Sequence, residues 1–106
     1  MNKFMRILVF FDLPVKSASQ RRIANKFRRF LLSDGYHMLQ YSIYARTCNG
    51  VDAVDKHKKR LYGSLPANGS VRMLVITEKQ YQSIEILVGK LNNGEKTFKA
   101  EQLTLY

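Results

Sequence analysis

Residues 4–14 read FMRILVFFDLP, and this stretch predicts a strand near the centre of a β-sheet. A short apolar run with β-branched and aromatic members is typical of a strand that is covered on both faces. We expect the strand to end at Asp12-Leu13-Pro14, because proline has no N–H to donate to a neighbouring strand.

The residues that follow alternate between helical and extended patterns. A helix is expected to begin near Ser17, which lies at capping-box spacing from Gln20, and to end at Gly35. Residues 36–46 are aromatic and β-prone but too long for one ordinary strand, which predicts two strands or one strand bent near 40–42. The apolar stripe of the helix comprises Ile23, Phe27, Phe30 and Leu31.

The second half of the chain continues the alternation. Asn49 is predicted to cap a helix over 51–62 whose inward side carries Val51, Val54 and Leu61. A strand over 71–76 leads into a third helix, which begins with Thr77 and Gln80 at capping-box spacing. The apolar stripe of this third helix comprises Tyr81, Ile84, Val88 and Leu91, and a last strand is predicted over 97–106.

The order β-α-β-β-α-β predicts one α+β domain over residues 1–106, with a ferredoxin-like antiparallel sheet and its helices on one face. The C-terminal strand would extend this pattern. Because the open face of such a sheet needs a cover, a homodimer formed through that face is the simplest arrangement.

Composition excludes several classes of protein. A length of 106 residues fits one domain, and a single cysteine, Cys48, excludes an intrachain disulfide scaffold. No apolar run approaches the ~18 residues that span a bilayer, and the short apolar run near the N-terminus does not suit a signal peptide. We therefore expect a cytoplasmic protein without a membrane partner.

Positive charge is the dominant compositional feature, with 18 Lys and Arg residues against 8 acidic residues. Residues 1–60 carry 13 basic and 4 acidic side chains, whereas residues 61–106 carry 5 and 4. Such an excess in one segment favours nucleic acid as a partner, with an anionic membrane surface or a solubility role as alternatives. The candidate phosphate-binding residues are Arg21, Arg22, Lys26, Arg28 and Arg29 in the first helix and Lys56, Lys58, Lys59 and Arg60 in the second.

Asp12 is the clearest candidate for chemistry. It is the only acidic residue among the first 33 and directly follows the apolar strand, where a carboxylate can hold a hard cation. Phosphodiester cleavage commonly uses such a cation, and two copies of Asp12 across a two-fold axis would hold Mg²⁺ better than one. The alternative is that Asp12 is an ordinary turn residue.

The remaining reactive side chains give weaker signals. His37 and His57 have no partner at zinc-ligand spacing, so we expect His37 to be packed and His57 to belong to the basic run. Cys48 is expected to have no chemical role. Three tyrosines are interleaved with apolar residues: Tyr36, Tyr41 and Tyr44. They could stack on bases, but we expect them in the core or in a dimer interface.

Four segments together resemble the Cas2 family, the small CRISPR-associated protein of the adaptation machinery. They are residues 5–14, 26–36, 38–44 and 75–81, and the likeness runs from residue 4 to about residue 91. It is strongest to the branch found beside type II interference systems.

The resemblance implies a ferredoxin-like homodimer in which segment 93–106 pairs with the partner's sheet. It also implies that Asp12 of each subunit binds one shared Mg²⁺ ion and that Ser42 lies near the active site. The activity implied is an endonuclease acting on RNA or double-stranded DNA. The dimer is further implied to bridge large CRISPR integrase subunits during spacer acquisition.

Three functions therefore remain open. The first is a metal-dependent phosphodiesterase that needs Asp12, and the second is a DNA-binding scaffold that does not. The third is an unrelated regulatory domain that binds a small effector and has no affinity for a phosphate backbone.

Overall fold

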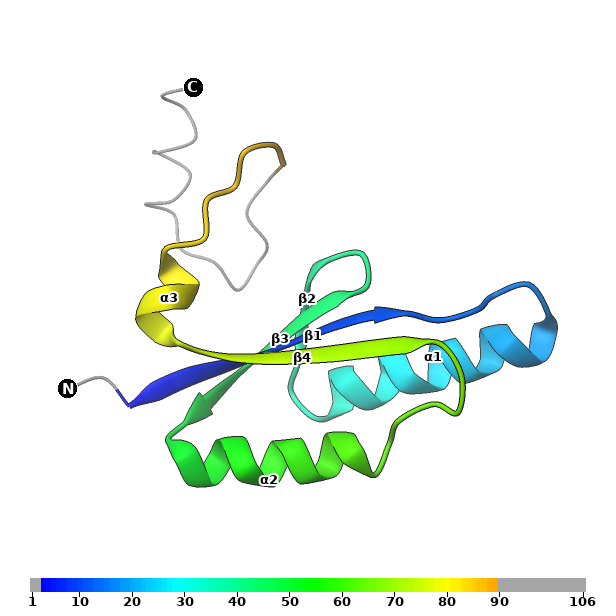
Figure 1. Cartoon of the computed structure of the whole chain (residues 1–106), viewed down its shortest axis with the longest axis horizontal. Helices are drawn as coiled ribbons and strands as arrows, with labels where there is room; N and C mark the ends of the chain where they lie inside the picture. Colours follow the sequence, from blue (N-terminus) through cyan, green and yellow to red (C-terminus); the bar gives the residue numbers. More distant parts are fainter. Residues whose placement is uncertain (1–2, 90–106) are drawn as a thin grey trace.

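The computed structural model describes residues 3–89. Within this range the elements are β1 (Phe4–Asp12), α1 (Ala18–Ser33), β2 (His37–Gln40), β3 (Ile43–Asn49), α2 (Val51–Tyr62), β4 (Ser70–Thr77) and α3 (Glu78–Gln82). The four strands form one sheet in the order β2-β3-β1-β4, and every neighbouring pair is antiparallel. This is the ferredoxin-like α+β arrangement that the sequence predicts, with β1 at the centre (Figure 1).

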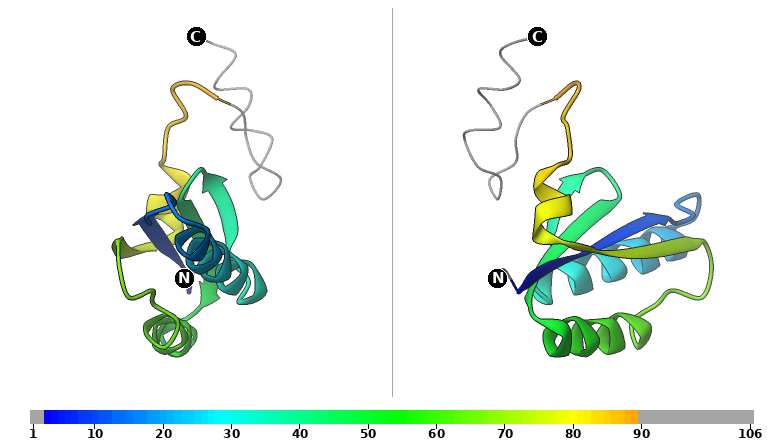
Figure 2. Two further views of the ribbon diagram at one scale, coloured as in Figure 1. Left: turned by 90° about the vertical axis from the view of Figure 1, so that its right-hand side faces the viewer. Right: turned by 60° about the vertical axis from the view of Figure 1, so that its left-hand side comes forward.

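Alternation along β1 divides the sheet into two faces. Ile7, Val9 and Phe11 belong to the main core beneath α1 and α2, together with Phe27 and Leu31 of α1. The other face carries Leu8, Ala45 and Tyr81, which form a smaller buried cluster. Figures 1 and 2 show α1 and α2 on one side of the sheet and α3 beside its opposite face. The expectation that all helices share one face is therefore wrong for α3.

The helix starts are partly as predicted. Ser17 caps α1 and Thr77 caps α3, each through a complete capping box. Asn49 does not cap α2, because it is the last residue of β3 and Gly50 occupies the N-cap without a side-chain bond. The glycine is required there because the backbone turns through φ 95°.

Two residues predicted to face inward are exposed instead. Ile23 is 46% exposed, because the inward stripe of α1 is centred on Ala24, Phe27 and Leu31. Val51 is 65% exposed at the first position of α2, where the helix leaves β3. The expected burial of Val54 and Leu61 is confirmed.

The third helix is much shorter than its apolar stripe predicts. It ends at Gln82, and residues 84–89 are not helical. Three of the five residues from 84 to 88 are β-branched, which lowers helix propensity, and Leu87 and Val88 are almost fully exposed. Leu91, the predicted strand over 97–106 and segment 93–106 lie outside the described residues.

The first turn of α3 is fixed to the open face by an ion pair. Arg6 of β1 donates to Glu78 through Nε at 2.7 Å and through Nη2 at 3.1 Å, and its guanidinium lies over the Tyr81 ring. Hydrogen bonding from Arg6 holds the pKa of Glu78 below its usual value, against the opposing effect of burial. No helix among residues 3–89 is long and apolar enough to cross a membrane.

Candidate active site on the open face of the sheet

Asp12 lies at the end of β1, directly opposite Ser70, the first residue of β4. It follows the alternation of Leu8 and Phe10, which places it on the face turned away from α1 and α2. The residue is exposed, and its carboxylate forms no ion pair within the described chain. A free carboxylate at a strand end is available to a cation or to substrate.

Gly69 holds the end of β1 in place. Its backbone has φ +95°, and a Cβ there would lie 2.8 Å from the Asp12 carbonyl oxygen and 2.7 Å from a methyl carbon of Leu13. Only glycine permits both this backbone conformation and this close approach. The position of Asp12 therefore depends on a residue in the loop before β4.

Ser42 reaches the same place from the opposite side of β1. It is the second residue of the two-residue connection between β2 and β3, and its φ of 66° is positive. Its carbonyl oxygen accepts a hydrogen bond from the Phe11 N–H at 3.1 Å, which ties the turn to the end of β1. Strained positive φ at a non-glycine residue is often found where function fixes the backbone.

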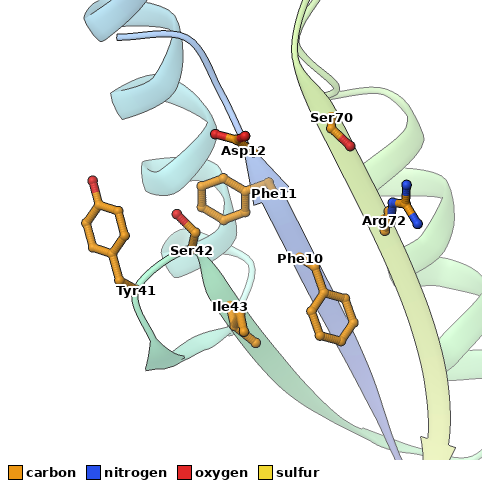
Figure 3. A pocket seen from close by; sticks show the side chains of 8 residues that line it. All are labelled: Phe10, Phe11, Asp12, Tyr41, Ser42, Ile43, Ser70 and Arg72. Atoms are coloured by element: carbon orange, nitrogen blue, oxygen red, sulfur yellow. The ribbon is translucent and has the colours of Figure 1, made fainter.

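These residues share one open hollow of about 340 Å³. Figure 3 shows Asp12 and Ser42 in the middle, Tyr41 on one side and Ser70 and Arg72 on the other. The floor is apolar, formed by Phe10, Phe11 and Ile43. The structure thus brings together Asp12 and Ser42, which are 30 positions apart in the sequence.

Three residues of the hollow escaped the sequence-based site prediction. Ser70 and Arg72 are polar positions in β4 that alternate with Val71 and Met73 of the core, and this alternation was the available signal. Tyr41 was expected in the core or a dimer interface; at 76% exposed it is not in the core, and the interface alternative stays a prediction. The expectation of burial is confirmed for Tyr36 and Tyr44.

The candidate phosphate-binding residues of α1 lie elsewhere. Arg22, Lys26 and Arg29 are exposed and, at 3.6 residues per turn, project from the side of α1 opposite to its buried stripe. They therefore point away from the sheet and do not enter the Asp12 hollow. Arg21 donates to the Val15 and Lys16 carbonyls, and Arg28 donates to Asn25.

The basic run of α2 is divided between surface and core. Lys56 and Lys59 are exposed, and Lys58 is half-buried. His57, expected to be part of the solvated run, is buried instead, and its Nδ1 lies 2.8 Å from Asp34 Oδ2. The Arg60 guanidinium donates to the other oxygen of Asp34 at 2.8 Å, so one of the predicted nucleic-acid ligands is engaged within the protein.

Asp34 is a structural residue that the sequence did not single out. It is the C-cap of α1 and is 7% exposed, so its two bonds join the end of α1 to α2. Burial raises its pKa, but the hydrogen bonds from Arg60 and His57 outweigh burial and leave the pKa lowered. Elsewhere, burial raises the pKa of the Cys48 thiol, which disfavours the reactive thiolate.

Comparisons with known proteins identify the family of this chain. The family model for "CRISPR associated protein Cas2" matches residues 5–84. A protein of Acidovorax ebreus named CRISPR-associated endoribonuclease Cas2 is 54% identical over 96% of this chain and 100% of its own length. A protein of the same name from Campylobacter jejuni is 42% identical over 99% of this chain and 73% of its own length. Another, from Flavobacterium psychrophilum, is 45% identical over 94% of this chain and 86% of its own length. The chain belongs to the Cas2 family of CRISPR-associated proteins.

Proposed function

We propose that this protein is a Mg²⁺-dependent endoribonuclease of CRISPR adaptation whose active site is the Asp12 hollow. One observation carries the proposal: an exposed carboxylate without an ion-pair partner in the described chain shares a hollow with Ser42 and Arg72. The relatives named endoribonuclease favour RNA as the substrate, with double-stranded DNA as the alternative.

The residues of the hollow fit Mg²⁺ only as a sparse site. Among residues 3–89 no group of three or more Asp, Glu, His or Cys side chains could hold a metal ion, so Asp12 is the single anionic donor. Mg²⁺ keeps several waters and often uses only one or two carboxylates together with substrate phosphates. One Asp12 from each of two chains, or Asp12 with a phosphate, satisfies this preference.

Asp12 and Ser42 each have a defined part in the proposal. Asp12 holds the cation, which when bound supplies charge neutralisation at the phosphate and activates water for attack. The Ser42 hydroxyl is placed to donate a hydrogen bond to a phosphate oxygen.

A homodimer formed through the open face is part of the same proposal. Leu74 and Phe4 lie on this face and remain 51% and 45% exposed. Residues 84–88, which follow α3, add exposed apolar side chains such as Leu87 and Val88. Burial of these groups against a second copy would bring the two Asp12 hollows into one assembly, in the cytoplasm.

A second candidate function is a DNA-binding scaffold that bridges the large CRISPR integrase subunits. The observation that favours it is the exposed face of Arg22, Lys26 and Arg29 on α1, which lies away from the hollow. A phosphate backbone bound there would need no chemistry at Asp12. The two functions can coexist, because they use opposite sides of the sheet.

The test is cleavage of end-labelled single-stranded RNA and double-stranded DNA by the purified full chain with Mg²⁺ or with EDTA. The proposal predicts Mg²⁺-dependent RNA cleavage that is lost on chelation and restored by added Mg²⁺. Cleavage that persists in EDTA, or no cleavage together with tight DNA binding, would overturn the enzyme proposal and leave the scaffold function.

A further inference from the structure

The Asp12 hollow carries two side chains with no task in the fold. Arg72 is exposed, and neither its guanidinium nor the Tyr41 ring has a hydrogen bond, ion pair or ring contact within the described chain. Tyr41 is 76% exposed at the β2–β3 turn. Large side chains that are left unpartnered beside a free carboxylate are candidates for contact with substrate.

Arg72 is placed to bind a phosphate near Asp12. It lies opposite Phe10 in the β1–β4 register, one pleat along the same face from the Asp12–Ser70 pair. The guanidinium forms two parallel hydrogen bonds to phosphate oxygens, which fixes orientation as well as charge. The α1 cations lie on the other side of the sheet, so among residues 3–89 Arg72 is the cation that lines the hollow.

Tyr41 is placed to bind a base rather than a phosphate. Its ring stands on the opposite side of the hollow from Arg72, with Asp12 and Ser42 between them (Figure 3). The short turn is held to β1 by the bond between Ser42 and Phe11, so the ring is presented from a fixed backbone. Exposed aromatic rings bind nucleic acid by stacking on bases that are unpaired.

We propose that Tyr41 and Arg72 make this site selective for an unpaired nucleotide, with Tyr41 stacking on the base and Arg72 binding the phosphate next to it. The proposal rests on the nuclease function and adds how its substrate is chosen. A paired base is already stacked within its helix and cannot offer its face to Tyr41, so duplexes are held by their backbone alone.

The test measures binding without cleavage, in EDTA, to short RNA with a 2-aminopurine base. Loss of one stacking contact in Tyr41→Ala is expected to weaken single-strand binding about five- to hundred-fold and to remove the fluorescence change, while duplex affinity stays the same. Tyr41→Phe is expected to bind as the wild type does. Tyr62→Ala is the matched control, because Tyr62 is 56% exposed on α2, away from the hollow.

Arg72→Gln is expected to weaken binding of single strands and to reduce the salt slope by about 0.7, the value for one phosphate contact. Lys79→Gln removes one exposed charge outside the hollow and is expected to change neither quantity. In Mg²⁺, Arg72→Gln is expected to raise KM for RNA, and Arg72→Lys to recover part of the loss.

Equal loss of single-strand and duplex binding in Tyr41→Ala would overturn the proposal, as would an equal effect of Tyr62→Ala. A change of oligomeric state in Tyr41→Ala would assign the ring to an interface between copies instead. These binding outcomes do not depend on whether the wild type cleaves RNA. Failure of the nuclease function is therefore distinguished from failure of this proposal by the separate cleavage assay.

Discussion

At the scale of single residues, the end of β1 depends on backbone features that are easily missed. Ser42 has positive φ, and Gly69 packs against the Asp12 carbonyl. Both residues hold the loops that frame Asp12, and neither takes part in a regular strand pairing. The hollow is therefore positioned by two turns of positive φ at the ends of strands.

The variant Ser42→Gly removes the hydroxyl but permits the same backbone conformation, so it tests the role of the hydroxyl by itself. Glycine accepts φ 66° without strain, so we expect the free energy of unfolding to stay within about 1 kcal/mol of the wild type. RNA cleavage is expected to fall about tenfold or more, because one donor to the phosphate is lost. Chemical denaturation and initial cleavage rates measure the two effects, and wild-type cleavage by Ser42→Gly would exclude a role for the hydroxyl.

Because of Asp34, the stability of the fold depends on pH in the acid range. Although burial raises the pKa of Asp34, the hydrogen bonds from Arg60 and His57 hold it below its ordinary value. These bonds therefore stabilise the protein above the ordinary pKa, and this stabilisation is lost as the pH falls through the folded-state pKa. Asp34→Asn is expected to lower the free energy of unfolding by about 1–3 kcal/mol at pH 7.

Urea denaturation of wild type and Asp34→Asn between pH 3 and pH 7 measures this effect. The difference between the two proteins is expected to shrink below about pH 4. Asp55→Asn, at an exposed position of α2 beyond its first turn, serves as the control. A difference in the free energy of unfolding that is constant from pH 3 to pH 7 would show that the charge of Asp34 does not contribute to stability.

Sequence reasoning found part of the site, and the reason is physical. Asp12 was visible because an acid directly follows a strongly apolar strand. Arg72 and Tyr41 were not selected, because only the β1–β4 register and the β2–β3 connection bring them beside Asp12. Likewise, the sequence places His57 in a basic run, whereas the structure shows it bonded to Asp34, which is 23 positions away.

At the scale of elements, the strands and the first two helices follow from local patterns. A capping box and apolar periodicity locate α1 closely, and apolar periodicity alone locates α2. Periodicity alone predicts a third helix that is longer than the one in the structure. Helix formation also requires a surface against which the apolar stripe is buried. The capped first turn has such a surface through Tyr81, and the exposed segment after Gln82 has none among the described residues.

The outer face of α1 is expected to carry duplex binding. The combined variant Arg22→Gln, Lys26→Gln and Arg29→Gln removes three exposed charges without touching the buried stripe. The slope of log affinity against log salt concentration is expected to fall by up to about 2.7, or about 0.9 for each phosphate contact. Filter binding of double-stranded DNA over a range of salt concentrations measures this slope.

Cleavage of a short single-stranded RNA by the same triple variant is expected to match the wild type, because α1 faces away from the hollow. Lys79→Gln is the single-charge control for each α1 substitution. Equal DNA affinity and slope in the triple variant and the wild type would remove α1 from the binding surface.

At the scale of the whole molecule, the open face makes a homodimer the expected state. Leu74→Glu places a charge on this face, at the position of edge strand β4 that pairs with Leu8, and is expected to yield monomers. Leu32→Glu is a matched control, because Leu32 is also 51% exposed but lies on α1. Light scattering coupled to size-exclusion chromatography distinguishes the two, and dimers in both variants would place the interface elsewhere.

The central proposal is that the Asp12 carboxylate makes the hollow a nuclease site. Single-turnover cleavage of end-labelled RNA in Mg²⁺ by wild type, Asp12→Asn and the exposed-residue control Asp55→Asn tests it most directly. We expect the wild type and Asp55→Asn to cleave at the same rate, and Asp12→Asn to bind RNA equally well but cleave at least about a hundredfold more slowly. Equal cleavage by Asp12→Asn and the wild type would contradict the proposal and return Asp12 to the role of a turn residue.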